Sequence, residues 1–462
     1  MSSVLSNGEV RVRATNRVDA DAEAGKSARK RAPRKSSGNW DPSRRTAPAL
    51  DRLRAQEAVR DHSLLPIRYA RMASSSWAYL RGAAAVMAAD LATSEHSGLT
   101  VQMCGDAHIL NFGLWASPER RLLFDARDFD ETLEGPFEWD LKRLATSIFV
   151  LADTEGVSTS VAAESARAAM RTYRDSMRRY AKSGELEVWY DSITAQETLR
   201  RLSTADAEWH ESNILKRSEK RSQAGATRQL TEVVDGRRKI TEAPPKRRHF
   251  TLGESEEISV YNQVFDTYLD SITPYLRRLV GRFTRVDSVQ QVVGVGSVGM
   301  RVYLHLMEGD SGREPVMFQV KQAAASVYEE FLGPSPFGNH GQRVTVGQRL
   351  MQSASDIFLG YVRVDGLDYY VRQFRDMKVI PSGREIAGIL PEFSAICGRA
   401  LAKSHARSGD PAAIAGYLGK GDAFVDSMIS FGTAYAAQTV ADHAELVDAI
   451  GAGVVPTTDT PW

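Results

Sequence analysis

The stretch CGDAHILNFG, residues 104–113, decides how this chain is interpreted, because it gathers an acid, an imidazole and an amide within six positions. These three groups are Asp106, His108 and Asn111. The stretch follows the apolar run LTVQM, residues 99–103, which is typical of a strand. We therefore expect the three polar side chains on a loop after a strand, where they are accessible for chemistry.

A second acidic segment follows closely. The residues RLLF, 121–124, are typical of a short strand, and DARDFDE, 125–131, forms an acidic turn after it. Phosphoryl transfer uses Mg²⁺ with oxygen ligands and a carboxylate that orients the attacking hydroxyl. We expect Asp106 to be that carboxylate and Asn111 and Asp128 to bind the metal. The interval of five residues from Asp106 to Asn111 equals the Asp-to-Asn interval of the kinase catalytic loop.

A glycine-rich segment lies much further along the chain. GVGSVG, with Gly294, Gly296 and Gly299, has the spacing G-x-G-x-x-G. Strand-like runs flank it on both sides, so we expect a glycine-rich hairpin and not the strand-to-helix turn of dinucleotide-binding folds. Glycine lets backbone amides approach phosphate oxygens closely. Lys321, in the next strand-like run FQVKQA, is placed to reach the same phosphates from beneath the hairpin.

The composition is that of a globular protein that folds in water. The length of 462 residues predicts two or three packing units, and a content of 42% hydrophobic and 25% charged residues is typical of soluble globular proteins. The net charge of +1 makes nucleic acid an unlikely partner, and no apolar run is long enough for a membrane helix. The start lacks the apolar core of a signal peptide, and the two cysteines lack metal-ligand spacing. We therefore expect a cytoplasmic protein without membrane contact.

The chain divides into segments of different composition, and together they predict an α+β fold. The expected segments are a disordered basic tail over 1–45, a helical lobe with both loops over 46–200, a basic linker and helix over 201–284, a β-rich nucleotide lobe over 285–380, a helical segment over 381–450 and a tail over 451–462.

GDAHILN followed by DFDETLEGPFEWDLKRL resembles the catalytic and metal loops of aminoglycoside phosphotransferase and choline-kinase-like enzymes. Those loops read GDxHxxN, then I-D-[WF], then D-L-A. The resemblance implies that Asp106 is the catalytic base and that Asn111 and Asp128 hold Mg²⁺, with Asp130 as the alternative metal ligand. It also implies that Asp140 braces the catalytic loop. The implied cofactors are ATP and Mg²⁺, and the acceptor, a small molecule or a protein, stays open.

A closer resemblance covers more of the chain. RMASSSWAYLRGAA, CGDAHILNFG, VGVGSVG and KSHARSGD resemble the bacterial family known as domain of unknown function 2252, over about residues 50 to 440. That resemblance implies no particular substrate.

The motif order differs from that of kinases, whose nucleotide lobe comes first. Here the glycine loop and Lys321 follow the catalytic loop, so we expect a two-lobed kinase-like fold that is circularly permuted, with residue 50 near residue 450. The acidic partner of Lys321 is expected just after its strand, where Glu329 and Glu330 are the candidates.

Other interpretations remain open. Asp106-Ala-His108 with Gly338-Asn339-His340 also occurs in binuclear metallophosphoesterases, where His108 would be a metal ligand; in the kinase-like interpretation it is a structural hydrogen-bonding residue. The protein could also bind nucleotide or a partner without transferring phosphate. Finally, the acids could simply cap helices and the glycines make turns. Arg81 and the stretch 405–410 either line the cleft or serve in caps and ion pairs.

Overall fold

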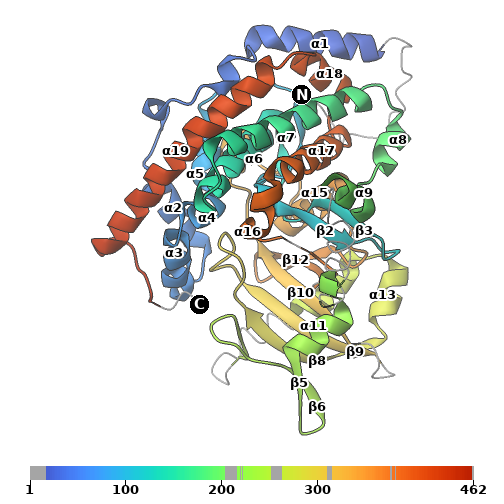
Figure 1. Ribbon diagram of the computed structural model, residues 1–462. Coiled ribbons are helices and arrows are strands. Elements are labelled where there is room, and N and C mark those ends of the chain that lie inside the picture. Colours follow the sequence, from blue (N-terminus) through green and yellow to red (C-terminus); the bar gives the residue numbers. More distant parts are fainter. Residues whose placement is uncertain are drawn as a thin grey trace.

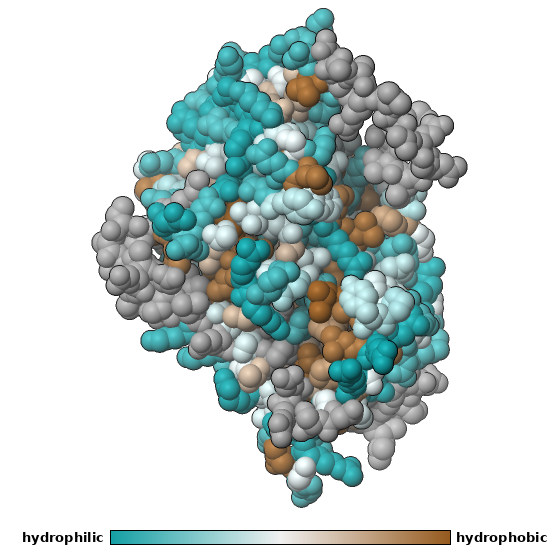
Figure 2. Space-filling view, turned by 90° about the vertical axis from the view of Figure 1, so that its right-hand side faces the viewer, coloured by the Kyte–Doolittle hydropathy of each residue, from teal (hydrophilic) through white to brown (hydrophobic). Residues whose placement is uncertain are grey.

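The computed structural model describes residues 17–202, 216–218, 220, 222–250, 263–309, 315–374, 377–379 and 381–459. It is a mixed α+β structure, as the sequence predicted, with most of the long helices in the upper part of Figure 1 and a six-stranded sheet in the lower part. Hydrophobic residues form small groups among hydrophilic ones on the face shown in Figure 2. Within the described ranges, no helix is both long enough and apolar enough to span a membrane.

The largest sheet is antiparallel, with the strand order β11-β12-β10-β9-β8-β7. Its strands are β7 Arg247–Arg248, β8 Phe283–Gln291, β9 Val302–Gly309, β10 Pro315–Ala323, β11 Gly360–Val364 and β12 Leu367–Gln373. Alternate residues enter different cores: Phe318 packs in the cluster of α13 (Pro274–Val280), and Met317 in the cluster of α11 (Gln223–Leu230). Lys321 lies on the same face of the sheet as Met317, at a position on β10 that α11 does not cover.

Two small antiparallel sheets carry the predicted loops. β1 (Thr100–Met103) pairs with β4 (Leu133–Pro136), and β2 (Phe112–Ala116) pairs with β3 (Leu122–Ala126). The loop 104–111 connects β1 to β2. The loop 127–132 connects β3 to β4.

A helical core supports these strands. α6 (Phe137–Thr154) is buried along most of its length and packs against α7 (Thr159–Tyr180) and α19 (Ala423–Gly451). α17 (Leu390–Ala406) packs against α7 and joins the same hydrophobic core. The remaining helices are α2 Ala49–Ala55, α3 Leu65–Ala73, α4 Ser76–Gly82, α5 Ala84–Ala92, α8 Glu185–Tyr190, α9 Ala195–Leu202, α14 Glu329–Leu332, α15 His340–Met351, α16 Gly383–Ile386 and α18 Pro411–Leu418.

The segment expected as a disordered tail over 1–45 differs from that expectation in its second part, whereas residues 1–16 lie outside the described residues. α1 (Arg17–Arg31) packs against α18. A Cβ on Gly25 would sit 1.8 Å from the carbonyl oxygen of Ala413, so small residues bring these helices into close contact. Arg34 also donates to the Leu418 carbonyl at 2.7 Å. Close packing of small residues orders this segment without large apolar side chains.

The beginning of the helical part, near residue 50, lies close to its end, near residue 450, as we expected from the order of the motifs. Leu53 of α2 and Leu446 of α19 belong to one hydrophobic cluster, against which Leu50 and Ile450 also pack. Residue 50 therefore lies near residue 450. The expected tail 451–462 also contributes to this cluster through the buried Val455, and residues 460–462 lie outside the described residues.

The segment 201–284 contains more structure than a linker. Besides α11, it forms a hairpin of β5 (Thr231–Val234) and β6 (Arg237–Ile240), and Ile240 packs under the large sheet. The helix expected toward the end of this segment is described only from residue 263 and is broken before α13. Residues 203–215 and 251–262 lie outside the described residues.

Candidate functional site

Strand register brings the two loops together. Met103 pairs with Leu133 and Phe112 pairs with Ala126, so both loops leave their strand pairs at the same end. Gly105, at φ +81°, makes the contact possible, because a Cβ there would lie 2.2 Å from the carbonyl oxygen of Glu131. The sequence placed these residues on two loops, and the structure packs the loops against each other.

Asp140 braces the first loop, in agreement with its predicted role. From the first turn of α6, its carboxylate accepts hydrogen bonds from the backbone N–H of Cys104 at 2.7 Å and of Gly105 at 3.0 Å. His405 Nε2 lies 3.1 Å from the same carboxylate, and its Nδ1 lies 2.9 Å from the Tyr173 hydroxyl. The carboxylate thus fixes the turn that precedes Asp106.

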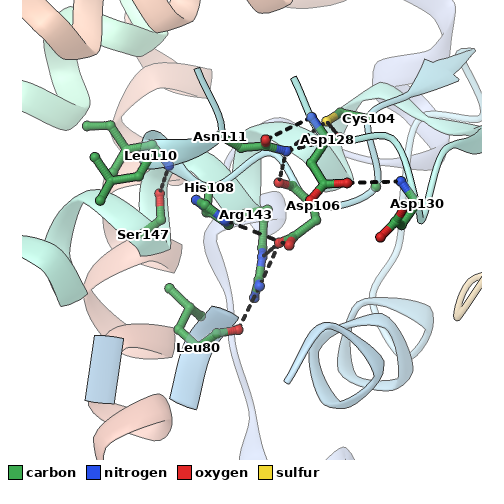
Figure 3. Close-up of polar contacts among 12 residues, drawn as sticks. Leu80, Cys104, Asp106, His108, Leu110, Asn111, Asp128, Asp130, Arg143 and Ser147 are labelled. Atoms are coloured by element: carbon green, nitrogen blue, oxygen red, sulfur yellow. Dashed lines mark hydrogen bonds and ion pairs between the residues drawn. The ribbon is translucent and has the colours of Figure 1, made fainter. Parts of the chain in front are cut away.

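Asn111 joins the two loops through its side-chain amide. Its Nδ2 donates to the carbonyl of Asp106 at 2.9 Å and to the carbonyl of Asp128 at 3.1 Å, and its Oδ1 accepts from the Asp128 N–H at 3.0 Å (Figure 3). An oxygen that already accepts one hydrogen bond keeps one lone pair for another partner. Asn111 is therefore foremost a brace between the loops.

Asp106 is held by an arginine that the sequence analysis did not single out. Arg143 of α6 donates from Nε at 2.9 Å to one carboxylate oxygen and also donates to the carbonyl of Leu80 at 2.7 Å. Burial raises the pKa of the Asp106 carboxyl, and Arg143 offsets only part of this effect. The Asp106 carboxylate keeps 22% of its surface exposed, so it remains accessible from the cavity.

Asp128 is the acid of this site that is least engaged by the described residues. One Asp128 oxygen accepts a hydrogen bond of 3.4 Å from the N–H of Asp130, and no ion pair within the described part of the chain involves its carboxylate (Figure 3). Burial alone would raise the pKa of this carboxyl, but Lys321 and Arg372 are among the cations that lower it below its ordinary value. An ionised carboxylate therefore faces the site without a contacting cation.

Lys321 forms an ion pair with Asp130, not with the predicted partners. Asp130 also accepts a hydrogen bond from the Tyr370 hydroxyl at 2.8 Å. The expectation for Glu329 and Glu330 was wrong. Glu329 accepts from the N–H of Ser326 and Ser335, and Glu330 pairs with Arg52 at the surface. The acidic loop folds back over β10, so a residue distant in sequence reaches the lysine first.

His108 is buried beside Asp106, with 6% of its surface exposed. Its Nε2 lies 3.8 Å from Asp106 Oδ2, its ring contacts Trp77 edge-on, and its Nδ1 has no hydrogen-bond partner among the described residues. Burial, reinforced by Arg81 and other nearby arginines, holds the pKa of His108 well below its ordinary value, so the ring is neutral.

The glycine loop connects β8 to β9, as predicted, and closes over the acids. Gly294 and Gly299 have positive φ values of 65° and 91°, and a Cβ on Gly296 would lie 3.3 Å from the carbonyl oxygen of Arg81. Three arginines hold the loop from outside by donating to its carbonyls. They are Arg60 to Gly296 and Val298, Arg68 to Gly296, and Arg71 to Gly294.

These groups line a cleft of two adjoining cavities. The larger, of about 490 Å³, is lined by Asn111, Asp128, Gly294 and Lys321, among others. The smaller, of about 70 Å³, includes Asp106, Asp130, Gly294 and Gly296. Arg81, His108, Asp128, Gly294 and Ser297 line both cavities. Gly299 lies outside the cleft and lines a separate cavity with Arg60. Two motifs that are distant in the sequence therefore share one site.

The residues of the metallophosphoesterase interpretation do not come together. His108 lines the cleft, whereas His340 lines the separate cavity behind the glycine loop. Asn339 caps the N-terminus of α15, where its Oδ1 accepts from the N–H of Gln342 at 3.0 Å and its Nδ2 donates to Asp368 at 2.9 Å. Over the described ranges, no group of three or more His, Cys, Asp or Glu residues is arranged to hold a metal by itself.

Sequence reasoning missed several cationic residues of the site. Arg143 lies on the buried face of α6. The signal that could have identified it is a charged residue within the apolar helical pattern of DLKRLA, because a charge is rarely buried without a partner. Arg372 lines the larger cavity from β12, next to Lys321 on the same face of the sheet. Arg60 leaves no comparable sequence signal, because its role depends on tertiary contact with the glycine loop.

Comparison with protein families identifies one match. The family model described as an uncharacterized protein conserved in bacteria (DUF2252) matches residues 60–449, so the chain belongs to this family. Comparisons with curated proteins and with solved structures found no match.

Proposed function

We propose that this member of the DUF2252 family is an ATP- and Mg²⁺-dependent phosphotransferase. One observation carries the proposal. The glycine loop and Lys321, from the β-rich part, line the same cleft as Asp106 and Asp128, from the two loops of the helical part. A phosphotransferase needs this combination of a phosphate-binding loop, a cation, a metal-binding acid and a carboxylate for the acceptor.

The donor phosphates would lie between the glycine loop and Lys321. Gly294 and Gly296 allow phosphate oxygens to approach the backbone, while Gly299 shapes the return of the loop to β9. Lys321 and Arg372 add positive charge on the sheet face of the larger cavity. The volume of about 490 Å³ lies within the range of small-molecule sites.

The donor set fits Mg²⁺ in the way that this ion is usually bound beside phosphates. Mg²⁺ commonly takes one or two protein carboxylates and completes its shell with water and phosphate oxygens. Asp128 supplies an ionised carboxylate without an ion-pair partner among the described residues, and Asn111 Oδ1 keeps one lone pair. Asp130 is the alternative ligand, but it would have to exchange its contact with Lys321. Bound Mg²⁺ would neutralise charge on the phosphates.

Asp106 would orient the acceptor hydroxyl and receive its proton. Arg143 positions this carboxylate, and Asp140 and Asn111 fix the loop on either side of it. Because burial raises the pKa of Asp106, we expect the rate to fall on acidification at a pH above the ordinary Asp range.

The same contacts support a kinase-like arrangement of two lobes in permuted order. The sheet with Lys321 would be the nucleotide lobe, and residues from about 50 to 200 together with 381–450 would form the helical lobe. The shared cluster of Leu50, Leu53, Leu446 and Ile450 supports this proposal, since permutation requires the joined ends to be close.

A second candidate is a nucleotide-binding protein that does not transfer phosphate. It is favoured by the contact of Asp106 with Arg143 and of Asp130 with Lys321, because both acids are already neutralised. Such a protein would bind ATP with Mg²⁺ and release no product.

Incubation with ATP labelled at either the α- or the γ-phosphate separates these candidates. With extracted metabolites as acceptors, phosphotransfer moves the γ label into a new compound and nucleotidyl transfer moves the α label. Asp106→Asn should abolish transfer and keep ATP binding, whereas Asp153→Asn, at an exposed site on α6, should change neither. Transfer at the wild-type rate by Asp106→Asn would refute the role of Asp106. Binding without any transfer would favour the second candidate.

A further inference from the structure

Several residues that line the cleft have a buried nitrogen atom without a hydrogen-bond partner among the described residues. Nε of Arg81, near the end of α4, and Nδ1 of His108 are two of these atoms, and Nε of Arg60 is another. Arg81 and His108 line both cavities, and the charge of Arg81 acts on the His108 ring. A buried polar group without a partner is costly, so such a group in a cavity is a candidate contact for a bound molecule.

Most neighbouring basic residues already have partners for their charged groups. Arg60 donates from Nη1 to the carbonyls of Gly296 and Val298. Arg143 donates to Asp106 and Leu80, Arg68 donates to Gln56 at 2.9 Å and to Gly82 at 3.0 Å, and Lys321 contacts Asp130. The charges of Asp106 and Asp128 act on the Arg81 guanidinium, but Arg81 forms no ion pair with either carboxylate. Its guanidinium is therefore available for another anion.

The orientation of His108 adds a second recognition element. Its Nε2 faces the carboxylate of Asp106, which favours a hydrogen on Nε2 and leaves Nδ1 as an acceptor. An acceptor atom next to the Arg81 guanidinium suits a ligand that has a hydroxyl group close to an anionic oxygen.

We propose that Arg81 and His108 form the acceptor subsite, which takes a small hydroxylated molecule carrying a phosphate or carboxylate group. Arg81 binds the anionic group, and His108 Nδ1 accepts from a hydroxyl, so that a second hydroxyl lies at Asp106. This assignment to the acceptor rests on the proposed phosphotransfer, whereas the anion site itself does not.

The position of the donor cations favours the acceptor over the nucleotide as the source of the anion. Lys321 and Arg372 line only the larger cavity, and Asp106 lines only the smaller one. Arg81 and His108 stand where the two cavities meet, beside Asp106. An anion on Arg81 would therefore hold its molecule next to the carboxylate that receives the proton.

Calorimetric titration of the full chain with glycerol 3-phosphate tests the anion site without nucleotide. We expect saturable binding that Arg81→Gln weakens about 10- to 100-fold, the range of a charge-assisted hydrogen bond, and that His108→Phe weakens less. Arg54→Gln, which removes an exposed arginine from α2, should leave it unchanged. No saturable binding by the wild type, or unchanged binding by Arg81→Gln, overturns the proposal. Loss in Arg372→Gln with retention in Arg81→Gln also overturns it, because the anion then occupies the larger cavity.

Repeating the titration with a non-hydrolysable ATP analogue and Mg²⁺ identifies the source of the anion. Simultaneous binding of both compounds supports the acceptor subsite. Displacement of glycerol 3-phosphate by the analogue overturns it and assigns Arg81 to the terminal phosphate. If the analogue does not bind while glycerol 3-phosphate does, the phosphotransferase proposal fails, the anion site remains and its assignment to an acceptor falls.

Discussion

Two buried lysine–aspartate pairs in this protein have the same chemistry and different surroundings. Lys403 of α17 pairs with Asp125 of β3, and both side chains are 0% exposed. Lys321 of β10 pairs with Asp130, whose side chain is 28% exposed at the cleft. Ser353 also donates to Asp125, from its N–H at 3.0 Å and from its hydroxyl at 3.1 Å, so the first pair is closed by protein on all sides.

The two pairs differ in whether another partner can reach them. In the protein interior, neither charge can find a replacement partner, so the Lys403 pair ties α17 to β3. At the cleft, Asp130 has the Tyr370 hydroxyl and solvent as further partners, which is why we propose that Lys321 exchanges its carboxylate for phosphate. Burial lowers the pKa of Lys403, whereas Asp130 raises that of Lys321 against the effect of burial.

The largest expected effect follows from breaking the interior pair. Lys403→Met leaves the Asp125 carboxylate buried without its cation, and we expect the free energy of unfolding to fall by about 3–5 kcal/mol. Urea unfolding followed by circular dichroism measures this change. The double variant Lys403→Met, Asp125→Leu should recover most of the loss, because no charge then remains buried. A loss below about 1 kcal/mol in Lys403→Met would show that water reaches this pair.

An intermediate effect is expected from His305, a buried histidine of β9. Burial depresses the pKa of His305 to about 3, and the ring contacts the Ser288 hydroxyl at 2.8 Å. Between the ordinary pKa of 6.5 and about 3, the unfolded chain binds a proton that the folded protein does not, so stability falls as pH falls through this window.

Paired urea titrations measure the size of this effect. From pH 6.5 to 5.0, His305 should account for about 1–2 kcal/mol of the lost unfolding free energy. His305→Gln should lose correspondingly less over the same interval, whatever its stability at neutral pH. Equal losses in both proteins would contradict the depressed pKa.

The smallest stability effect is expected from the cleft pair. Lys321→Met removes the cation, but Asp130 can be hydrated and keeps its Tyr370 bond, so the free energy of unfolding should change by about 1 kcal/mol or less. The same urea titration compares it with Lys403→Met. A loss as large as that of Lys403→Met would remove the distinction between the two pairs.

The sequence predicted those parts of the fold and site that depend on local pattern. Strand-like runs on both sides of the glycine segment and the run FQVKQA identified the strands that become β8, β9 and β10, and motif spacing placed Asp106, Asn111 and Asp128 on two loops. The brace role of Asp140 also agrees with its hydrogen bonds. These features follow from residue type and short spacing, which determine local backbone structure and loop position.

The remaining features depend on tertiary contacts that spacing does not encode. Lys321 meets Asp130 because the acidic loop folds over the sheet, and no periodicity reports that approach. α1 is ordered by close packing at Gly25 and Gly416, a signal that a count of large apolar residues misses. Arg143 is far from Asp106 in sequence and reaches it only because α6 passes beneath the loop.

We propose that the glycine loop with Lys321 and the acidic loop with Asp128 form one nucleotide site. Calorimetric titration with ATP, with and without Mg²⁺, tests this proposal in the wild type, Lys321→Met and Asp128→Ala, with Asp153→Asn as the control. We expect Mg²⁺-dependent binding by the wild type and the control and its loss in both site variants, each shown to be folded by circular dichroism. Wild-type affinity in either site variant, or no binding by the wild type, would contradict it.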